Sequence, residues 1–250
     1  MDNTTLLKSR FEDLAAQADK RFSYTFSGFL SLPEQDLFLK MKNTFPVPAF
    51  LYGPSEDSER KIAVFGSSEE LGYEPDYPVK VLEIAPVSDR FSETLSHRDY
   101  LGAVLNTGID RSLTGDIVIH ETRAWLFCLD SIADFIKETL THIRHTDVTV
   151  READSDIPEL KPSFEEVRLN VPSERLDAVV AAFIKESRTK AALLFTRELV
   201  FVNSQVVTSL SAHLKEGDVL NVRGYGKAIY EGIDGTSRKG RLYVVLKKYI

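Results

Sequence analysis

The spacing of hydrophobic residues predicts two helices and a hairpin near the start of the chain. A first helix is expected from about Thr5 to Asp19, and a second after Ser31. Apolar runs over Ala49–Tyr52 and Lys61–Phe65 flank a glycine- and proline-containing loop, which is typical of a β-hairpin. The three- and four-residue steps of the first helix join Leu6, Leu7, Phe11, Leu14, Ala15 and Ala18 on one face. Together these elements predict an N-terminal αβ domain over residues 1–75.

The pattern that follows predicts the order strand, helix, strand, strand, helix, strand. Gly108 is placed to end the first of these helices, and Asp130-Ser131 is placed to cap the second. This order indicates a ferredoxin-like domain over residues 76–155. The strands are expected at 79–84, 116–119, 125–129 and 147–151, and the helices at 97–105 and 132–143.

An acidic, proline-containing segment from Glu152 to Glu166 predicts a linker to a third unit over residues 165–250. Two helices are expected there, beginning after Pro172 and after Ser187. Short strands should follow at 200–203, 206–207 and 219–223, with a turn at Ser204-Gln205 between the first two. The predicted fold class is therefore α+β, built from three small units.

Composition narrows the class of protein. The chain has 250 residues, of which 43% are hydrophobic and 28% charged, as in globular proteins. No apolar run approaches the roughly 20 residues of a membrane span, so a cytoplasmic protein without a membrane partner is expected. Cys128 is the single cysteine, which excludes an internal disulfide and a cysteine metal cluster.

Charge is distributed unevenly along the chain. Residues 1–170 hold 18 Lys and Arg against 30 Asp and Glu, a balance of −12. Residues 171–250 hold 13 against 8, a balance of +5. Because a local positive field attracts polyanions even on an acidic protein, the C-terminal unit is the expected nucleic-acid-binding part.

The helix that begins after Ser187 carries a candidate phosphate site. Arg188 and Lys190 lie in its first turn, beside the positive end of the helix dipole, where cations are disfavoured. An anion docked on the free amides would reverse that preference. The alternative is that both side chains extend into water at a cost of a few tenths of a kcal/mol each.

Several motifs of the C-terminal unit resemble the S4-type RNA-binding domain. They are Arg175-Leu176-Asp177, Ser187-Arg188-x-x-Ala191, Val200-x-Val202-Asn203, Val206-Val207 and Gly217-Asp218. Glu198 stands where that family usually has glycine, and Ser204-Gln205 replaces its usual Gly-Lys turn. The resemblance implies binding to structured RNA. Candidate RNA-binding residues are Arg175, Ser187, Arg188, Lys190, Arg197, Asn203, Arg223 and Lys227, with Ser187 capping the helix, Asn203 presenting a polar edge, and the last two in a glycine-rich loop.

Nearly the whole chain resembles the YlmH family of bacterial proteins, which come from the cell-division gene neighbourhood. The motifs outside the C-terminal unit are Phe26-Ser27-Gly28-Phe29-Leu30, Leu95-Ser96-His97-Arg98-Asp99-x-Leu101-Gly102 and Gly115-Asp116-Ile117. The resemblance implies a non-enzymatic RNA-binding protein that associates with the large ribosomal subunit. Its partners would be rRNA and peptidyl-tRNA, and its role would be ribosome quality control of stalled nascent chains.

Other readings of the chain remain open. S4-type domains are often fused to pseudouridine synthases, so an RNA-modifying enzyme is one alternative, although no synthase pattern surrounds Asp99. A cell-division adaptor that binds protein partners through the acidic domains is another. His97 and Arg98 are either RNA contacts or part of a capped helix start. His142 and His145 are three residues apart, as in a metal pair, but they lack acidic or cysteine partners at ligand spacing and are expected to complement the negative end of the helix dipole. No cofactor motif is present.

Overall fold

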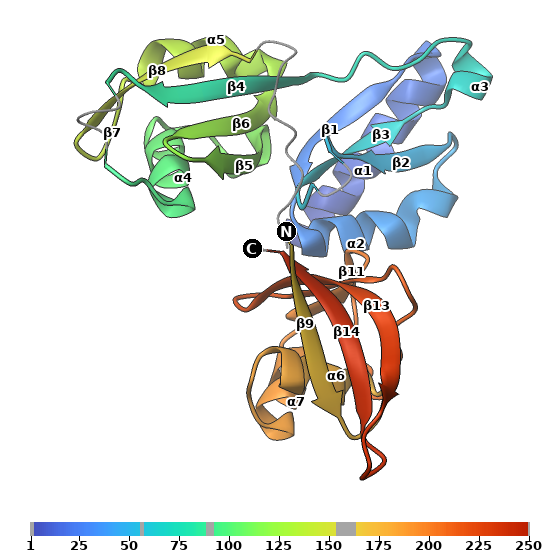
Figure 1. The fold of residues 1–250 in the computed structure, drawn as a ribbon. Coiled ribbons are helices and arrows are strands. Elements are labelled where there is room, and N and C mark those ends of the chain that lie inside the picture. Colours follow the sequence, from blue (N-terminus) through green and yellow to red (C-terminus); the bar gives the residue numbers. More distant parts are fainter. Residues whose placement is uncertain (1–2, 56–57, 89–92, 154–163, 250) are drawn as a thin grey trace. The chain divides into compact units, whose positions relative to one another are not determined.

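The computed structural model describes residues 3–55, 58–88, 93–153 and 164–249. The fold is α+β, as predicted, and the chain divides into two compact units, Met1–Leu160 and Lys161–Ile250 (Figure 1). The first unit contains both the predicted N-terminal αβ domain and the predicted ferredoxin-like domain. Within the described residues, no helix is long and apolar enough to cross a membrane.

The N-terminal part of the first unit is a three-stranded antiparallel sheet with two long helices. The predicted hairpin pairs Ala49 with Phe65 and Tyr52 with Ile62, and the third strand, β1, adds to it in the order β1-β3-β2. Both predicted helices are confirmed, whereas β1 was not predicted. The elements are α1 (Asn3–Arg21), β1 (Thr25–Leu30), α2 (Leu32–Met41), the 3-10 helix η1 (Lys42–Thr44), β2 (Ala49–Tyr52), β3 (Lys61–Phe65) and α3 (Ser68–Leu71).

The middle part of the first unit has the predicted ferredoxin-like topology. All neighbours in its sheet are antiparallel, and the order β5-β6-β4-β8 is completed by a short extra strand, β7. Helix α5 ends at Thr139, earlier than predicted, because the chain then forms the β7–β8 hairpin. The elements are β4 (Val79–Pro86), α4 (His97–Asn106), η3 (Arg111–Leu113), β5 (Thr114–His120), β6 (Arg123–Leu129), α5 (Asp130–Thr139), β7 (His142–Ile143) and β8 (Thr146–Glu152).

The starts and ends of the two middle helices test the predicted caps. Gly108 follows α4 with a φ of +90°, and its amide donates to the carbonyl oxygen of Leu105 at 3.0 Å, so the predicted helix end is confirmed. The predicted Asp130-Ser131 cap is wrong. Leu129 occupies the cap position of α5 with no side-chain bond, and Asp130 lies in the first turn, where its charge favours the dipole.

The two sheets of the first unit share an apolar seam. Phe29, Ile62 and Val64 of the N-terminal sheet form one buried cluster with Phe127 of the middle sheet. At the edge of this seam, Arg60 donates to the carbonyl oxygens of Phe29 at 2.7 Å and Thr114 at 3.0 Å. The N-terminal sheet therefore covers part of the face of the middle sheet that lies opposite α4 and α5.

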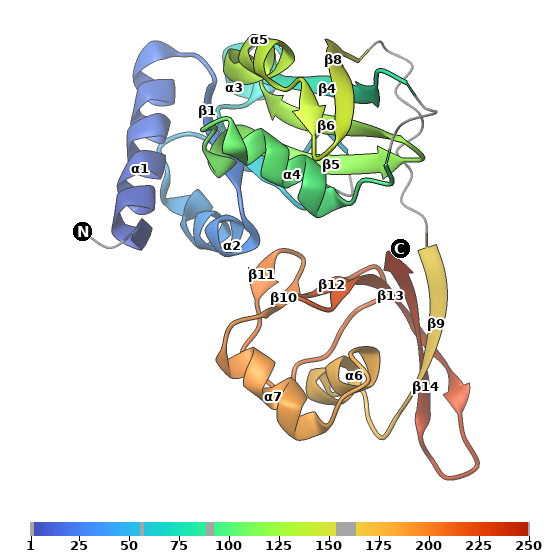
Figure 2. The ribbon, with the colours of Figure 1, turned by 90° about the vertical axis from the view of Figure 1, so that its left-hand side faces the viewer.

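The second unit is a six-stranded antiparallel sheet whose buried face packs on α6 and α7 (Figure 2). The strand order is β11-β10-β12-β13-β14-β9, so the first strand of the unit pairs with the last along eight residues. The elements are β9 (Phe164–Val171), α6 (Leu176–Phe183), α7 (Arg188–Thr196), β10 (Val200–Val202), β11 (Gln205–Val206), β12 (Val219–Val222), β13 (Gly226–Thr236) and β14 (Leu242–Tyr249).

Two boundaries of the second unit differ from prediction. The predicted linker is shorter, because Glu152 belongs to β8 and residues 164–166 belong to β9; its remainder at 154–163 lies outside the described residues. The tight turn between β10 and β11 is Asn203-Ser204, since Val202 pairs with Gln205. Both turn residues have positive φ values, +50° and +67°, as a type I′ hairpin turn requires.

Candidate nucleic-acid interface

The first turn of α7 forms as the sequence predicts. Ser187 is the N-cap residue, and its hydroxyl accepts a hydrogen bond from the Lys190 amide at 3.2 Å. This bond satisfies one of the amides that a helix start leaves free. The capping role predicted for Ser187 is confirmed.

A buried carboxylate ties this helix start to the start of α6. Asp177 is 5% exposed and accepts hydrogen bonds from Arg175 Nε at 3.1 Å and from Arg188 Nη2. Burial raises the pKa of Asp177, but the hydrogen bonds from Arg188 and Arg175 outweigh it and hold the pKa below the ordinary value. Asp177 thus stays ionised and orients both guanidinium groups.

The two arginines remain available to a ligand. Their side chains are 41% exposed at Arg175 and 51% exposed at Arg188, although each donates to Asp177. A guanidinium has five N–H donors, so each keeps donors directed away from the carboxylate. Two cations held by one anion leave a net charge of +1 at the site, which is suited to a phosphate oxygen.

Lys190 forms an ion pair with Glu186, which directly precedes the N-cap residue of α7. Its Nζ lies 2.8 Å from Glu186 Oε1, and this contact raises the pKa of Lys190. Together with the Arg188–Asp177 pair, it shows that local carboxylates offset the unfavourable dipole at both cations. The placement of these cations is therefore explained in part by their carboxylate partners within the fold. Since exposed pairs are weak, a phosphate could replace Glu186 as the partner of Lys190.

Asn203 lies at the hairpin turn, as the corrected register shows. Its Nδ2 donates to Asp218 Oδ1 at 2.8 Å, and its Oδ1 accepts from the Val219 amide at 2.9 Å. These bonds join the turn to the start of β12. The polar edge predicted for Asn203 is engaged within the chain, and its contact with RNA stays a prediction.

Arg197 directly follows the end of α7, and Arg223 directly follows the end of β12. The Arg197 amide donates to Leu193, ending α7, while the Arg223 amide donates to the Leu199 carbonyl oxygen at 2.9 Å. Both side chains belong to exposed residues. Between them, Glu198 has a φ of +55°, the conformation for which glycine is usual.

The predicted glycine-rich loop is shorter than expected. Arg223, Gly224 and Tyr225 form the turn, whereas Gly226 and Lys227 already belong to β13. The Lys227 ammonium lies 4.3 Å from the centre of the Tyr249 ring on β14, a cation–π contact. Tyr225 is 46% exposed beside Arg223, so the turn offers an aromatic ring and a cation together.

Sequence reasoning missed the role of Asp177. The residue belongs to a quoted motif, but Arg188 lies eleven residues away, and only the packing of α6 against α7 brings the pair together. The sequence did hold one signal of a buried carboxylate, because Asp177 stands in the first turn of an otherwise apolar helix. Buried charges of this kind are expected to have partners.

The structure places the two histidine-bearing segments of the first unit at a helix start and on a short strand. Ser96 and Asp99 form a capping box at the start of α4, with the Ser96 amide 2.8 Å from the Asp99 carboxylate. His97 and Arg98 follow that cap. His142 lies on β7, not on a helix as predicted, and no group of three His, Cys, Asp or Glu residues suited to a metal occurs in the described ranges.

Cys128 is expected to be inert in the folded chain. Its side chain is fully buried in the core of the middle sheet, and burial raises the pKa of its thiol to about 12. Only a thiolate reacts rapidly, so a disulfide reagent at pH 8 should modify Cys128 only after unfolding. Labelling of the native chain as fast as of the urea-unfolded chain would contradict this burial.

Comparisons with known proteins agree with the sequence motifs. The family model described as "Putative RNA-binding domain in YlmH" matches residues 73–156. Over 230 residues, the chain is 29% identical to "Ribosome-associated protein quality control protein P2" of Bacillus subtilis (strain 168), covering 92% of this chain and 89% of that protein. The predicted resemblance to the YlmH family is confirmed by these two matches.

One solved structure is also similar in part. It is "Cell division protein ylmH from Streptococcus pneumoniae", which has a TM-score of 0.48 and 19% sequence identity. The match covers 62% of this chain and 93% of that chain.

Proposed function

We propose that this chain is a non-enzymatic RNA-binding protein that associates with the large ribosomal subunit. It would contact rRNA and tRNA and assist ribosome quality control of stalled nascent chains in the cytoplasm. The observation that carries the proposal is the arginine pair at the α6 and α7 helix starts. Asp177 orients Arg175 and Arg188 near the start of α7. Both guanidinium groups and the positive end of the helix dipole would therefore attract the same RNA phosphate.

Charge supports the same assignment. The second unit, 161–250, holds 15 Lys and Arg against 10 Asp and Glu, a balance of +5, while residues 1–160 hold 16 against 28. The relative named for ribosome quality control aligns with most of the chain, and the matched family model names RNA binding. We further propose three domains, 1–75, 76–155 and 165–250, with the last of the S4 type.

A cell-division adaptor is the second candidate function. The charge of residues 1–160, which hold 16 Lys and Arg against 28 Asp and Glu, favours it, since an acidic unit repels RNA and leaves its surface to protein partners. An adaptor that binds protein through the acidic unit should keep its partner after RNA is destroyed. A pull-down from nuclease-treated lysate separates the two functions, because an RNA-bound complex would be lost.

The proposal predicts different RNA affinities for the two units. A fragment beginning near Pro162 should fold alone and retain RNA binding, while residues 1–160 alone should bind little, because their balance is −12. Roughly four phosphate contacts of the second unit contribute about −3 to −4 to the log-log salt slope of the full chain. Equal affinity of the two fragments, or a slope near zero, would refute the phosphate site.

A further inference from the structure

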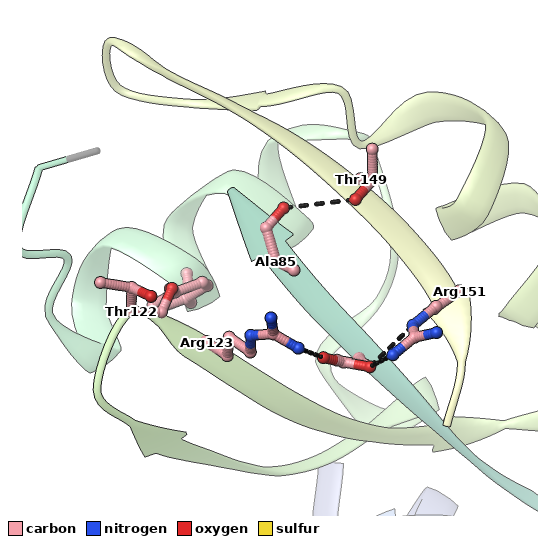
Figure 3. A network of polar contacts seen from close by, with 7 residues as sticks. Ala85, Thr122, Arg123, Thr149 and Arg151 are labelled. Carbon is pink, nitrogen blue, oxygen red and sulfur yellow. Dashed lines mark hydrogen bonds and ion pairs between the residues drawn. The ribbon is translucent and has the colours of Figure 1, made fainter. Parts of the chain in front are cut away.

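The middle domain carries a second pair of arginines on one carboxylate. Glu83 lies on β4, the central strand, and is paired across the sheet with Trp125 of β6 and Arg151 of β8. Figure 3 shows Arg123 and Arg151 extending toward each other from the two strands that flank β4. These side chains lie on the face opposite the helices, since Leu82 and Ile84 alternate with Glu83 into the helix-covered core.

The contacts fix the position of both guanidinium groups. Arg123 Nη1 lies 2.7 Å from Glu83 Oε1, while Arg151 donates to Oε2 from Nε at 2.8 Å and from Nη2 at 2.6 Å. Burial raises the pKa of Glu83, but the bonds from Arg151 and Arg123 lower it below its ordinary value. The Glu83 side chain is 6% exposed, against 49% at Arg123 and 62% at Arg151. The carboxylate is therefore buried beneath two accessible cations.

Stability alone does not account for this arrangement. A buried ion pair contributes little over an apolar residue of similar size, because desolvation offsets the attraction. Glu83 lies within an otherwise largely apolar strand, where valine or isoleucine would pack without that cost. What the carboxylate adds is a fixed separation and orientation of two guanidinium groups.

The described central strands β4 and β6 present no exposed aromatic ring on this face of the sheet. A sheet that binds single-stranded RNA stacks bases on exposed aromatic rings of its central strands. Here the aromatic residues of β6 are buried, with Trp125 5% and Phe127 4% exposed. Phe127 packs against Phe29 and Val64 of the N-terminal sheet. Charged donors, and not stacking rings, are what this face presents.

We propose that Arg123 and Arg151 form a second RNA contact that binds phosphate oxygens of the backbone of paired RNA. The ligand class rests on the proposed function, whereas the site is separate from that of the second unit. Each guanidinium uses its inner edge on Glu83 and keeps outer N–H donors for phosphate oxygens. Two arginines fixed on one carboxylate can both bind backbone phosphates, and the lack of exposed rings on β4 and β6 disfavours stacking by unpaired bases.

The test uses the full chain and a matched control on the other face of the same domain. The test variant is Glu83→Gln, Arg123→Gln, Arg151→Gln, which removes two cations and their anion together, so no buried charge is left alone. The control is Asp134→Asn, Lys80→Gln, Lys137→Gln, which removes the same charges near α5, where Lys137 pairs with Asp134 at 2.7 Å. Affinity for an RNA hairpin is measured across a salt series.

The expected result is a loss of about tenfold in hairpin affinity and a salt slope shallower by about two for the test variant only. For an unpaired RNA of the same length, the same variant should lose less. Unchanged affinity and slope, or equal losses in test and control variants, would overturn the site. A larger loss for unpaired RNA than for the hairpin would overturn the ligand class.

A third variant separates this inference from the proposed function. Arg188→Gln, Lys190→Gln should weaken hairpin binding whether or not the middle domain contributes. If that variant loses affinity while the Glu83 triple variant binds as wild type, the inference fails and the proposed function stands. If neither variant loses affinity, the proposed function fails as well.

Discussion

Replacing Arg188 and Lys190 by glutamine should lower the affinity of the full chain for deproteinised large-subunit rRNA by at least about a hundredfold. A hydrogen bond to a charged group contributes about 1.5 to 3 kcal/mol, so two lost contacts correspond to that factor or more. Both cations lie in the first turn of α7, whose amides add to the attraction for phosphate. Filter binding at fixed salt measures the change.

Glutamine is chosen because of the partner that Arg188 has in the fold. A glutamate at this position would face the buried carboxylate of Asp177 and destabilise the second unit, whereas a glutamine amide can still donate to it. Arg238→Gln, Lys239→Gln is the matched control, because these exposed cations lie between β13 and β14. A folded test variant that binds as tightly as this control would contradict the assignment of the α7 site.

The largest stability effect is expected when Glu83 loses both arginines. Arg123→Gln, Arg151→Gln leaves a carboxylate that is 6% exposed without a cationic partner, which costs about 3 kcal/mol at pH 7. Adding Glu83→Gln to the same chain should restore most of that loss, since the buried charge is gone. Urea unfolding of the three proteins, followed by circular dichroism, gives the free energies of unfolding.

The loss of unfolding free energy in the Arg123→Gln, Arg151→Gln variant should also depend on pH. In the wild-type chain the arginines hold the pKa of Glu83 below its ordinary value, so this group stabilises the fold above about pH 4 and loses its effect below. In the double variant only burial remains, and it raises the pKa of Glu83. That carboxylate takes up a proton first as the pH falls, and the difference in stability should narrow from pH 7 towards pH 4. A difference that stays constant or widens would contradict the buried charge.

Local patterns predicted much of the first unit, because its elements are short and regular. The βαββαβ order was readable from alternation and from helix ends such as Gly108, and the antiparallel sheet confirms it. Strand β1 was missed because its last four residues are all buried, which hides the alternation typical of a strand. Strand β7 was assigned to the end of the preceding helix, since His142-Ile143 continues its apolar spacing, whereas β8 was predicted as a strand at 147–151.

The second unit shows what a local pattern cannot supply. Strands β9, β13 and β14 were not predicted, because β9 pairs with the far end of the chain and β13 is interrupted by Gly232 and Gly235. The cap at Ser187 depends on neighbouring residues and was predicted correctly. Asp177 and Glu83 each bind arginines from other elements, so the geometry of both sites depends on the packed fold.

The central claim is that the second unit attaches the chain to the large ribosomal subunit through the start of α7. Sucrose-gradient sedimentation of the tagged full chain in cell lysate tests it most directly. Wild type and the Arg238→Gln, Lys239→Gln control should sediment with large subunits, while Arg188→Gln, Lys190→Gln should stay at the top of the gradient with unchanged circular dichroism. Wild type remaining at the top, or the folded Arg188 and Lys190 variant sedimenting with large subunits as wild type does, would contradict the account.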